Sequence, residues 1–168
     1  KARLGGKLKY FVSGGAALAQ EIAEFFASVD ITILEGYGLT ETSPVLTCNT
    51  ETARRFGSVG KPLYNIDLKI AEDGEILAKG PSIMLGYFNK PEATDEVMDS
   101  DNWFHTGDIG EIDNDGFLKI TDRKKSLIIT SGGKNIAPAP LENAVISSPY
   151  VEQIVVIGEN RNFISALI

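Results

Sequence analysis

The residues most capable of chemistry begin with a six-residue motif. Tyr37–Thr42 reads YGLTET and combines a hydroxyl with a carboxylate. The Thr40 hydroxyl can donate to a phosphate oxygen, and the Glu41 carboxylate can hold the Mg²⁺ that accompanies such a phosphate. With flanking glycines in the segment, we expect the motif to lie on a turn that leaves both side chains free for a ligand.

Two later motifs add a carboxylate and a guanidinium. Thr106–Asp108 reads TGD, and Arg123 follows Asp122 after a short apolar run. Asp108 can accept two hydrogen bonds from a ribose diol, and Arg123 can add a charge-assisted contact. The alternative for Arg123 is a surface ion pair with Asp122. Taken with the first motif, these residues predict a nucleotide site, again on glycine-flanked turns.

The elements that must position the first motif form a β-α-β unit. Apolar runs at Leu8–Val12 and Ile31–Leu34 predict strands, and the run at Leu18–Ala27 has the apolar spacing of a helix. Such strands are parallel, with a right-handed crossover, and ligands bind beyond their carboxyl ends. Gly14-Gly15 and the Gly36–Gly38 segment follow those two ends, so we expect the two glycine turns to face one crevice.

The middle of the chain predicts short antiparallel strands. Asp67–Ile70 and Glu75–Ala78 flank a turn with Gly, and so do Ile109–Ile112 and Phe117–Ile120. Between the hairpins, Pro91–Met98 starts with Pro and has an acidic first turn, which predicts a short helix. We expect a small antiparallel barrel or curled sheet, with Tyr87 and Phe88 packed against it.

A charged break separates the last third of the chain. Residues 122–125 are all charged, and a new pattern of strand, helix and strand follows. The predicted elements are a strand at 127–129, a helix from Leu141 to about Ser147 that Pro138 and Pro140 precede, and a strand at 151–157. This pattern predicts a domain boundary near Arg123.

Composition narrows the class of protein. The chain has 168 residues, 43% of them hydrophobic, and a net charge of -7, which argues against a nucleic-acid-binding face. No apolar run is long enough to span a bilayer, and no signal peptide is present. Cys48 is the single cysteine, which favours a reducing, cytoplasmic setting. The chain starts at Lys1 and ends at Ile168 within an apolar run, so we expect it to be a piece of a longer polypeptide.

Three stretches together resemble the successive signature motifs of the adenylate-forming enzymes. They are GYGLTET at 36–42, WFHTGDIGEID at 103–113 and DRKKSLIITSGGKNIAP at 122–138. Within that superfamily, SGGAAL and GGKNIAPAPLE most resemble bacterial long-chain fatty acid–CoA ligases.

The resemblance implies an α/β fold combined with an α+β one. Residues 1–122 would be the C-terminal part of a large AMP-binding domain, with a β-α-β segment at 1–50 and a β-rich, barrel-like subdomain at 51–122. Residues 123–168 would begin a small, mobile C-terminal α+β domain.

The implied activity has two steps, the formation of acyl-AMP from a fatty acid and ATP·Mg²⁺ and the transfer of the acyl group to coenzyme A. The partners are then small molecules: fatty acid, ATP or AMP, Mg²⁺ and CoA, without nucleic acid. Peripheral membrane association of the parent enzyme and its oligomeric state stay open.

The resemblance also implies roles for single residues around the nucleotide. Gly15 and Ala16 would line the adenine, and Tyr37 would stack on it. Thr40 would touch the α-phosphate and Glu41 would help to hold Mg²⁺, which makes these two the catalytic candidates. The ribose would bind to the aspartate–arginine pair described above.

Further roles concern the end of the chain. Lys125 would be the hinge about which the small domain rotates. Gly132 and Gly133 would let the pantetheine arm of CoA pass close to the backbone, where a Cβ would obstruct it. Lys134 would lie near AMP or CoA.

Several alternatives stay open. The parent could be a fatty acyl-AMP ligase or an adenylation domain that loads a carrier protein, or a non-catalytic module that binds AMP. The superfamily's phosphate-gripping loop and its C-terminal lysine have no counterpart between Lys1 and Ile168, so we expect the piece by itself not to activate fatty acids. His105, the only histidine, is expected to be a positioned polar residue without acid–base duty.

Overall fold

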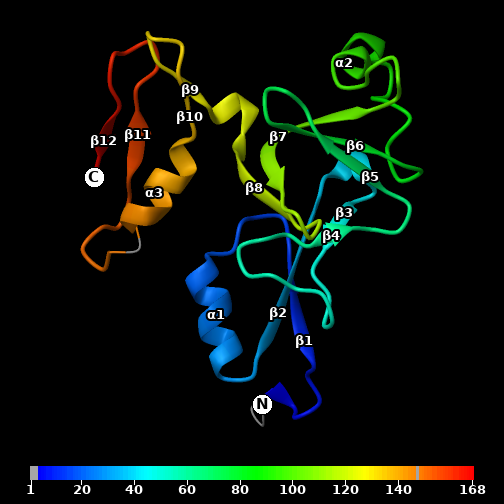
Figure 1. Ribbon diagram of the computed structural model, residues 1–168, viewed down its shortest axis with the longest axis vertical. Helices are drawn as coiled ribbons and strands as arrows, with labels where there is room; N and C mark the ends of the chain where they lie inside the picture. The colour runs from blue at the N-terminus through cyan, green and yellow to red at the C-terminus, as the bar shows by residue number, and fades with distance from the viewer. Residues whose placement is uncertain (1–3, 147) are drawn as a thin grey trace.

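The first sheet begins with the predicted β-α-β unit. In the computed structural model, which describes residues 4–146 and 148–168, β1 (Tyr10–Ser13) and β2 (Thr32–Gly38) run parallel with α1 (Gln20–Ser28) between them (Figure 1). Ser13 lies opposite Glu35 in the ladder. The prediction is confirmed, except that all three elements start later than expected and β2 continues through the glycines of the first motif. The first three residues of the predicted 1–50 segment lie outside the described residues.

The helix of this unit covers the sheet only in part. It packs on β2 through Ala23, which is buried, whereas Ile22 and Phe25 stay exposed. The spacing of these apolar residues is helical, but a single neighbouring strand covers only a narrow stripe of the helix. None of the helices in the described parts of the chain is long and apolar enough to cross a membrane.

Two further strands make this sheet mixed. β3 (Val45–Cys48) runs antiparallel to β2, and β4 (Lys61–Pro62) runs antiparallel to β3. The strand order is therefore β1-β2-β3-β4, and the sheet continues past residue 50.

The second sheet is antiparallel throughout. Its strands are β5 (Asp67–Ile70), β6 (Glu75–Lys79), β7 (Phe104–Ile112) and β8 (Leu118–Arg123), in that spatial order. Both predicted hairpins are confirmed. Irregular register in the β6–β7 and β7–β8 ladders bends the sheet. Closure into a barrel is not found among the strand pairings of the described residues.

This sheet corrects one expectation about the motifs. Asp108 lies inside β7 and Arg123 ends β8, so neither belongs to a turn. The glycine in TGD suggested a turn in the sequence. In the structure Gly107 does adopt a φ of 72°, but it does so inside the strand. The helix between the hairpins, α2, is confined to Pro91–Asp95, shorter than predicted.

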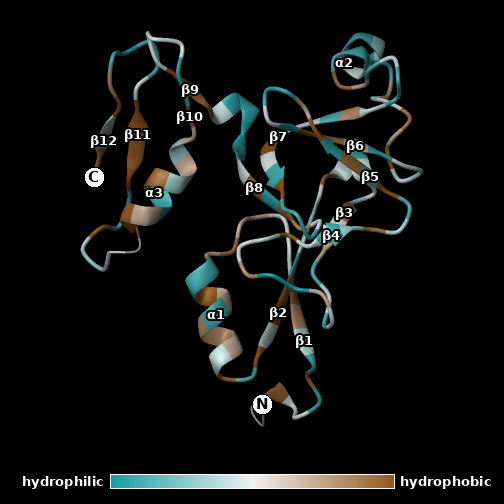
Figure 2. Cartoon of the chain, viewed as in Figure 1, coloured by the Kyte–Doolittle hydropathy of each residue, from teal (hydrophilic) through white to brown (hydrophobic). Residues whose placement is uncertain are grey.

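The last part of the chain forms a separate lobe, joined to β8 by η3 (Lys124–Ser126) (Figure 1). Its elements are β9 (Ile128–Ile129), β10 (Asn135–Ile136), α3 (Pro138–Ile146), β11 (Val155–Ile157) and β12 (Ser165–Leu167). Figure 2 shows hydrophobic residues along β11, which carries the buried Val156.

Helix α3 starts earlier than the sequence suggested. It begins at Pro138 rather than Leu141, because proline suits the first turn, where its missing N–H has no intrahelical partner to lose. Ser147, the predicted last residue of this helix, lies outside the described residues.

One apolar cluster joins the two larger sheets. Tyr37 and Leu46 from the first sheet pack with Ile76 and Leu118 from the second. The sheets are also tied by backbone, since Leu118 N–H donates to the Gly60 carbonyl at 2.9 Å. The candidate site motifs of both sheets therefore lie on strands that share this core.

Gly60 should be intolerant of any side chain. A Cβ there would lie 1.9 Å from the carbonyl carbon of Cys48, in a backbone with φ of 89°. Gly116 has a similar φ of 83° but open space around it. We expect Gly116→Ala to lower the free energy of unfolding by about 1 kcal/mol and Gly60→Ala to lower it by more than about 3 kcal/mol. Urea denaturation of the two variants checks this, and equal losses would contradict the clash.

Candidate functional site

The site is built around the buried carboxylate of Asp108. This residue in β7 is 4% exposed and lies opposite Arg123 of β8. Tyr37 Oη, from β2, donates to Asp108 Oδ2 at 2.7 Å, and Arg123 Nε lies 3.1 Å from Asp108 Oδ1. Three of the predicted site residues thus meet, although 71 positions separate Tyr37 from Asp108 in the chain.

The side chain of Arg123 forms its ion pair with Asp108 and not with the adjacent Asp122. Asp122 instead accepts the backbone N–H of Arg123 at 2.6 Å and that of Ala139 at 3.4 Å. The guanidinium side chain is 71% exposed, so it can reach a ligand while it contacts Asp108. The alternative of a surface pair with Asp122 is therefore not the arrangement in this structure.

Tyr37 is fixed as a donor. Burial raises the pKa of its phenol well above the usual range, and the adjacent Asp108 carboxylate raises it further, against a lowering contact from Thr106. The hydroxyl therefore keeps its proton and orients the carboxylate. Because the residue is only 8% exposed, little of its ring is open, and stacking on adenine stays a prediction.

The two glycine segments meet as expected, although Gly36–Gly38 belongs to strand β2 and is not the turn that the sequence suggested. A Cβ on Gly14 would lie 3.4 Å from the carbonyl oxygen of Gly36, so the two segments are in van der Waals contact. Gly15 has a φ of 83°, and Gly15 and Ala16 are both exposed beside this contact. The carboxyl ends of β1 and β2 therefore form one edge, and Tyr37 lies in β2 next to this contact.

The phosphate and metal candidates lie on the short helical turn η2 (Thr40–Thr42). Thr40 is exposed, and Glu41 is half-buried, with Oε1 accepting from Tyr87 Oη at 2.9 Å. No cluster of three or more metal-ligating side chains occurs in residues 4–146 and 148–168. A single carboxylate with free acceptor capacity fits an Mg²⁺ that also binds phosphate oxygens.

Tyr87 is a site residue that the sequence did not reveal. It was expected only to pack, yet its hydroxyl orients Glu41, and its backbone N–H donates to Thr94 Oγ1 at 2.9 Å. The expected packing of Phe88 is wrong, because this residue is 90% exposed. The available signal was Gly86: its φ of 145° favours glycine, and a Cβ there would lie 2.9 Å from Thr94 Oγ1.

Glu75 was also missed. Its side chain is 4% exposed, and Oε1 accepts the backbone N–H of Gly107 at 2.9 Å. Oε2 lies 3.0 Å from His105 Nδ1 and 2.8 Å from Lys124 Nζ. Burial would raise the pKa of this carboxyl, but the three hydrogen bonds outweigh it and hold the pKa below its ordinary value. His105 is thus positioned by Glu75, and its expected lack of acid–base duty stays a prediction.

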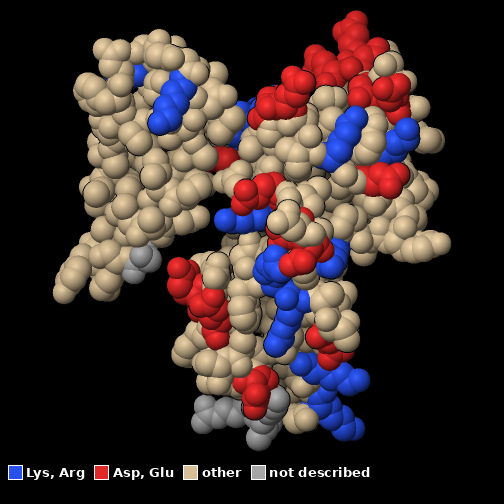
Figure 3. Space-filling view, viewed as in Figure 1, with Lys and Arg blue, Asp and Glu red and all other residues tan. Residues whose placement is uncertain are grey.

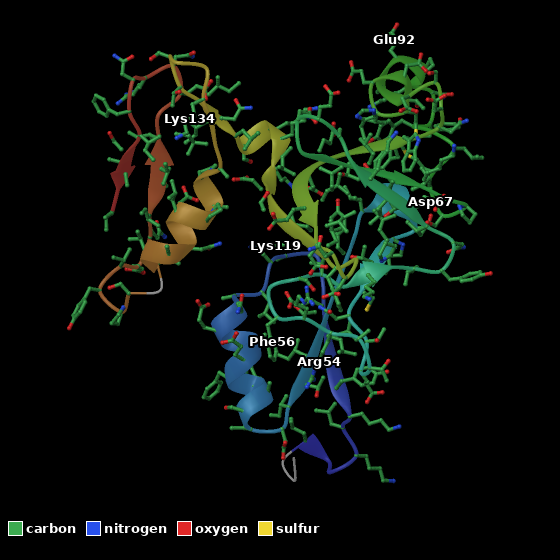
Figure 4. The ribbon with its side chains drawn as sticks, viewed as in Figure 1. Arg54, Phe56, Asp67, Glu92, Lys119 and Lys134 are labelled. Carbon is green, nitrogen blue, oxygen red and sulfur yellow. The ribbon has the colours of Figure 1, made fainter. Side chains whose placement is uncertain are left out.

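The candidates for the CoA step lie elsewhere. Gly132, Gly133 and Lys134 form the exposed loop between β9 and β10, closed by a 2.8 Å bond from Gly133 N–H to the Thr130 carbonyl. Figure 4 places Lys134 on the C-terminal lobe, apart from β7 and β8. Lys125 is exposed in η3 between the two parts. The structure therefore does not bring these four residues to the Asp108 cluster.

Comparison with known proteins bears on this geometry. Residues 1–88 match the sequence model of the AMP-binding enzyme family, and residues 125–168 match that of the AMP-binding enzyme C-terminal domain. The chain belongs to the AMP-binding enzyme family. The adenylate-forming resemblance is thereby confirmed.

Among curated relatives, the chain is 46% identical over 168 residues to the long-chain-fatty-acid–CoA ligase FadD15 of Mycobacterium bovis, covering all of this chain and 28% of the relative. It is 41% identical over 164 residues to the long-chain-fatty-acid–CoA ligase ACSBG2 of Rattus norvegicus, covering 94% and 25%. The chain thus spans about a quarter of these relatives.

Among solved structures, the chain is similar to O-succinylbenzoate coenzyme A synthetase from Bacillus subtilis. The unliganded form has a TM-score of 0.84 and 33% identity, over 95% of this chain and 37% of that one. The complex with ATP and magnesium ion has a TM-score of 0.82 and 31% identity, over 98% and 38%. The mixed α/β architecture with an antiparallel sheet is shared with these enzymes.

Removal of the Tyr37 hydroxyl should destabilise the chain. Tyr37→Phe leaves the buried Asp108 carboxylate with one donor fewer, so we expect the free energy of unfolding to fall by about 1–3 kcal/mol. The matched control is Tyr64→Phe at a fully exposed tyrosine, with an expected change within about 0.5 kcal/mol. Urea denaturation measures both, and a neutral Tyr37→Phe would contradict the arrangement.

The Glu75 network predicts a pH dependence of stability. Its folded-state pKa lies below the ordinary 4.5, so its stabilisation is present above about pH 4.5 and is lost as the pH falls through the folded value. We expect Glu75→Gln to lower the free energy of unfolding by about 1–3 kcal/mol at neutral pH, with the two curves converging in acid. The exposed Glu72→Gln serves as control. A difference that stays constant from neutral to acid pH would count against the network.

Proposed function

We propose that the full-length protein that carries this chain activates a long-chain fatty acid with ATP·Mg²⁺ and transfers the acyl group to coenzyme A. The observation that supports this most strongly is the meeting of Tyr37, Asp108 and Arg123, in a chain 46% identical to a FadD15 ligase. We further propose that residues 1–122 belong to the large domain and 123–168 to the mobile one, in a cytoplasmic protein.

In the first step the fatty acid carboxylate attacks the α-phosphorus of ATP. A bond from carboxylate oxygen to phosphorus forms, the bond to the bridging oxygen breaks, and pyrophosphate leaves. Bound Mg²⁺ would neutralise phosphate charge. Glu41 would hold the ion, with Tyr87 fixing the carboxylate, and the exposed Thr40 would donate to the α-phosphate.

The ribose would bind at Asp108. Each carboxylate oxygen has two acceptor positions, so Asp108 can accept from ribose hydroxyls while it keeps Tyr37 and Arg123. Gly15 and Ala16 would lie along the adenine, since both are exposed and a Cβ on Gly15 would meet no atom within 4 Å. The residues therefore bind and align the nucleotide, while the reacting groups come from the substrates.

In the second step the thiol of CoA attacks the acyl carbonyl, the thioester forms, and AMP leaves with the electron pair of the broken bond. Gly132 and Gly133 would admit the pantetheine arm, with Lys134 near AMP or CoA. These residues lie on the C-terminal lobe, so the proposal includes a rotation at Lys125 that brings them to the adenylate.

The test is pyrophosphate exchange into ATP by the full-length protein. We expect exchange that requires Mg²⁺ and a long-chain fatty acid, and a fall of about 10–100-fold in kcat/KM with Asp108→Asn, because a hydrogen bond to a charged group is lost. Asp101→Asn, at an exposed aspartate, is the matched control and should match the wild type.

The same assay separates the alternatives. Exchange with transfer to a phosphopantetheinyl carrier but not to free CoA would identify a fatty acyl-AMP ligase or a carrier-loading adenylation domain. AMP binding without exchange would identify a non-catalytic module. Exchange that ignores the fatty acid, or an Asp108→Asn variant as active as the wild type, would contradict the proposal.

A further inference from the structure

The linker between the two parts of the chain is held by a double ion pair. Lys124 Nζ lies 2.7 Å from Asp73 Oδ2 and 2.8 Å from Glu75 Oε2. Asp73 and Glu75 belong to the turn and first residue of the β5–β6 hairpin, about fifty positions earlier in the chain. Both carboxylates raise the pKa of Lys124, so the ammonium stays charged. The first residue after β8 is thereby attached to the body of the second sheet.

Glu75, one of these two carboxylates, also binds β7, the strand that carries Asp108. Glu75 binds His105 and the Gly107 N–H on β7 as well as Lys124. Its side chain is 4% exposed, so water cannot replace these partners easily. The position of Lys124 is therefore coupled to the segment that leads into Asp108.

The next residue is held differently. Lys125 is exposed and has no ion pair among the residues of the described ranges. From here the chain enters the lobe of β9–β12 and α3, and Figure 3 shows an open gap between the lower part of that lobe and the part that carries α1. The start of α3 contacts β8 on the other side of the linker, because Ala139 N–H donates to Asp122 Oδ2 at 3.4 Å.

We propose that Lys124 is a positioning residue that clamps the linker to the β5–β6 hairpin, so that rotation of the C-terminal lobe begins at Lys125. Rotation there would part Ala139 from Asp122 and leave the Lys124 contacts intact. The clamp keeps the Arg123–Asp108 pair in register while the lobe changes orientation. It deepens the proposed function, because a fixed pivot would bring the β9–β10 loop to one place beside the adenylate.

The strength of the clamp follows from its geometry. An exposed ion pair would contribute little, and Lys124 itself is 45% exposed. Its second partner is buried and also bound by β7, so removal of the lysine leaves a buried carboxylate with one donor fewer. Loss of these two ion pairs should free the orientation of the linker. Within the described chain, no other ion pair of residues 122–126 reaches this hairpin.

The experiment measures the orientation of the lobe directly. Spin labels at Glu92→Cys on α2 and Glu152→Cys before β11 report the distance between the two parts in the full-length protein, with its other reactive cysteines replaced. We expect Lys124→Met to make the distance distribution about twice as wide, because more orientations of the linker become populated. Lys124→Arg, which keeps the charge, should restore most of the wild-type distribution.

Controls separate the clamp from a general loss of stability. Lys119→Met removes a lysine of β8 whose partner, Glu111, is exposed and 3.6 Å away, so the distribution should not change. Asp73→Asn removes one exposed partner, and we expect a smaller broadening that adds nothing when combined with Lys124→Met. If Lys124→Met fails to fold, Asp73→Asn and Lys124→Arg decide the question.

Kinetics supply a second readout. With Lys124→Met we expect the KM for ATP to stay within about twofold and the rate of acyl transfer to CoA to fall about tenfold. Distributions of Lys124→Met and Asp73→Asn that match the wild type, or an equal broadening with Lys119→Met, would overturn the clamp. A wild type without fatty-acid-dependent exchange would defeat the proposed function instead, since the distances are measured without turnover.

Discussion

The structure depends on the burial of one carboxylate, Asp108, between strands from two sheets. A buried charge is tolerated only where donors surround it, and here the donors come from Tyr37 in the first sheet and Arg123 in the neighbouring strand. Strands β2, β7 and β8 therefore have to keep their relative positions for this charge to remain stable. The same requirement leaves a preformed acceptor bound to Tyr37, which follows Gly36 in β2.

A second buried carboxylate, Glu75, extends this order to the linker. It binds the backbone of β7 on one side and Lys124 on the other, so the segment that presents Asp108 and the segment that leaves the sheet share one partner. The proposed nucleotide site and the proposed clamp on the linker thus both depend on the same hairpin. An enzyme with two half-reactions would need both properties, since one substrate stays bound while the lobe moves.

Several large apolar side chains of the chain are exposed. Phe25 and Phe88 are largely exposed, and α1 covers only part of its sheet. The curated relatives described above are three to four times longer than this chain, as the coverages of 28% and 25% imply.

The amino-acid sequence by itself determined the local elements and the family. Apolar periodicity and glycine turns identified the β-α-β unit and both hairpins, and the order of the motifs identified the AMP-binding family. These features are encoded within short stretches, where spacing reports directly on backbone geometry. The boundaries were less accurate: Asp108 looked like a turn residue beside Gly107 but lies in a strand, because pairing with β8 overrides the local preference.

Only the tertiary structure decided which polar side chains meet. Tyr87 reaches Glu41 across 46 positions, and Lys124 reaches Glu75 across 49. No periodicity or motif encodes such pairs, because they depend on how two sheets pack and on which carboxylates that packing buries. The donors that bind a buried carboxylate are those that the fold brings within hydrogen-bond distance, so the pairs depend on the tertiary structure.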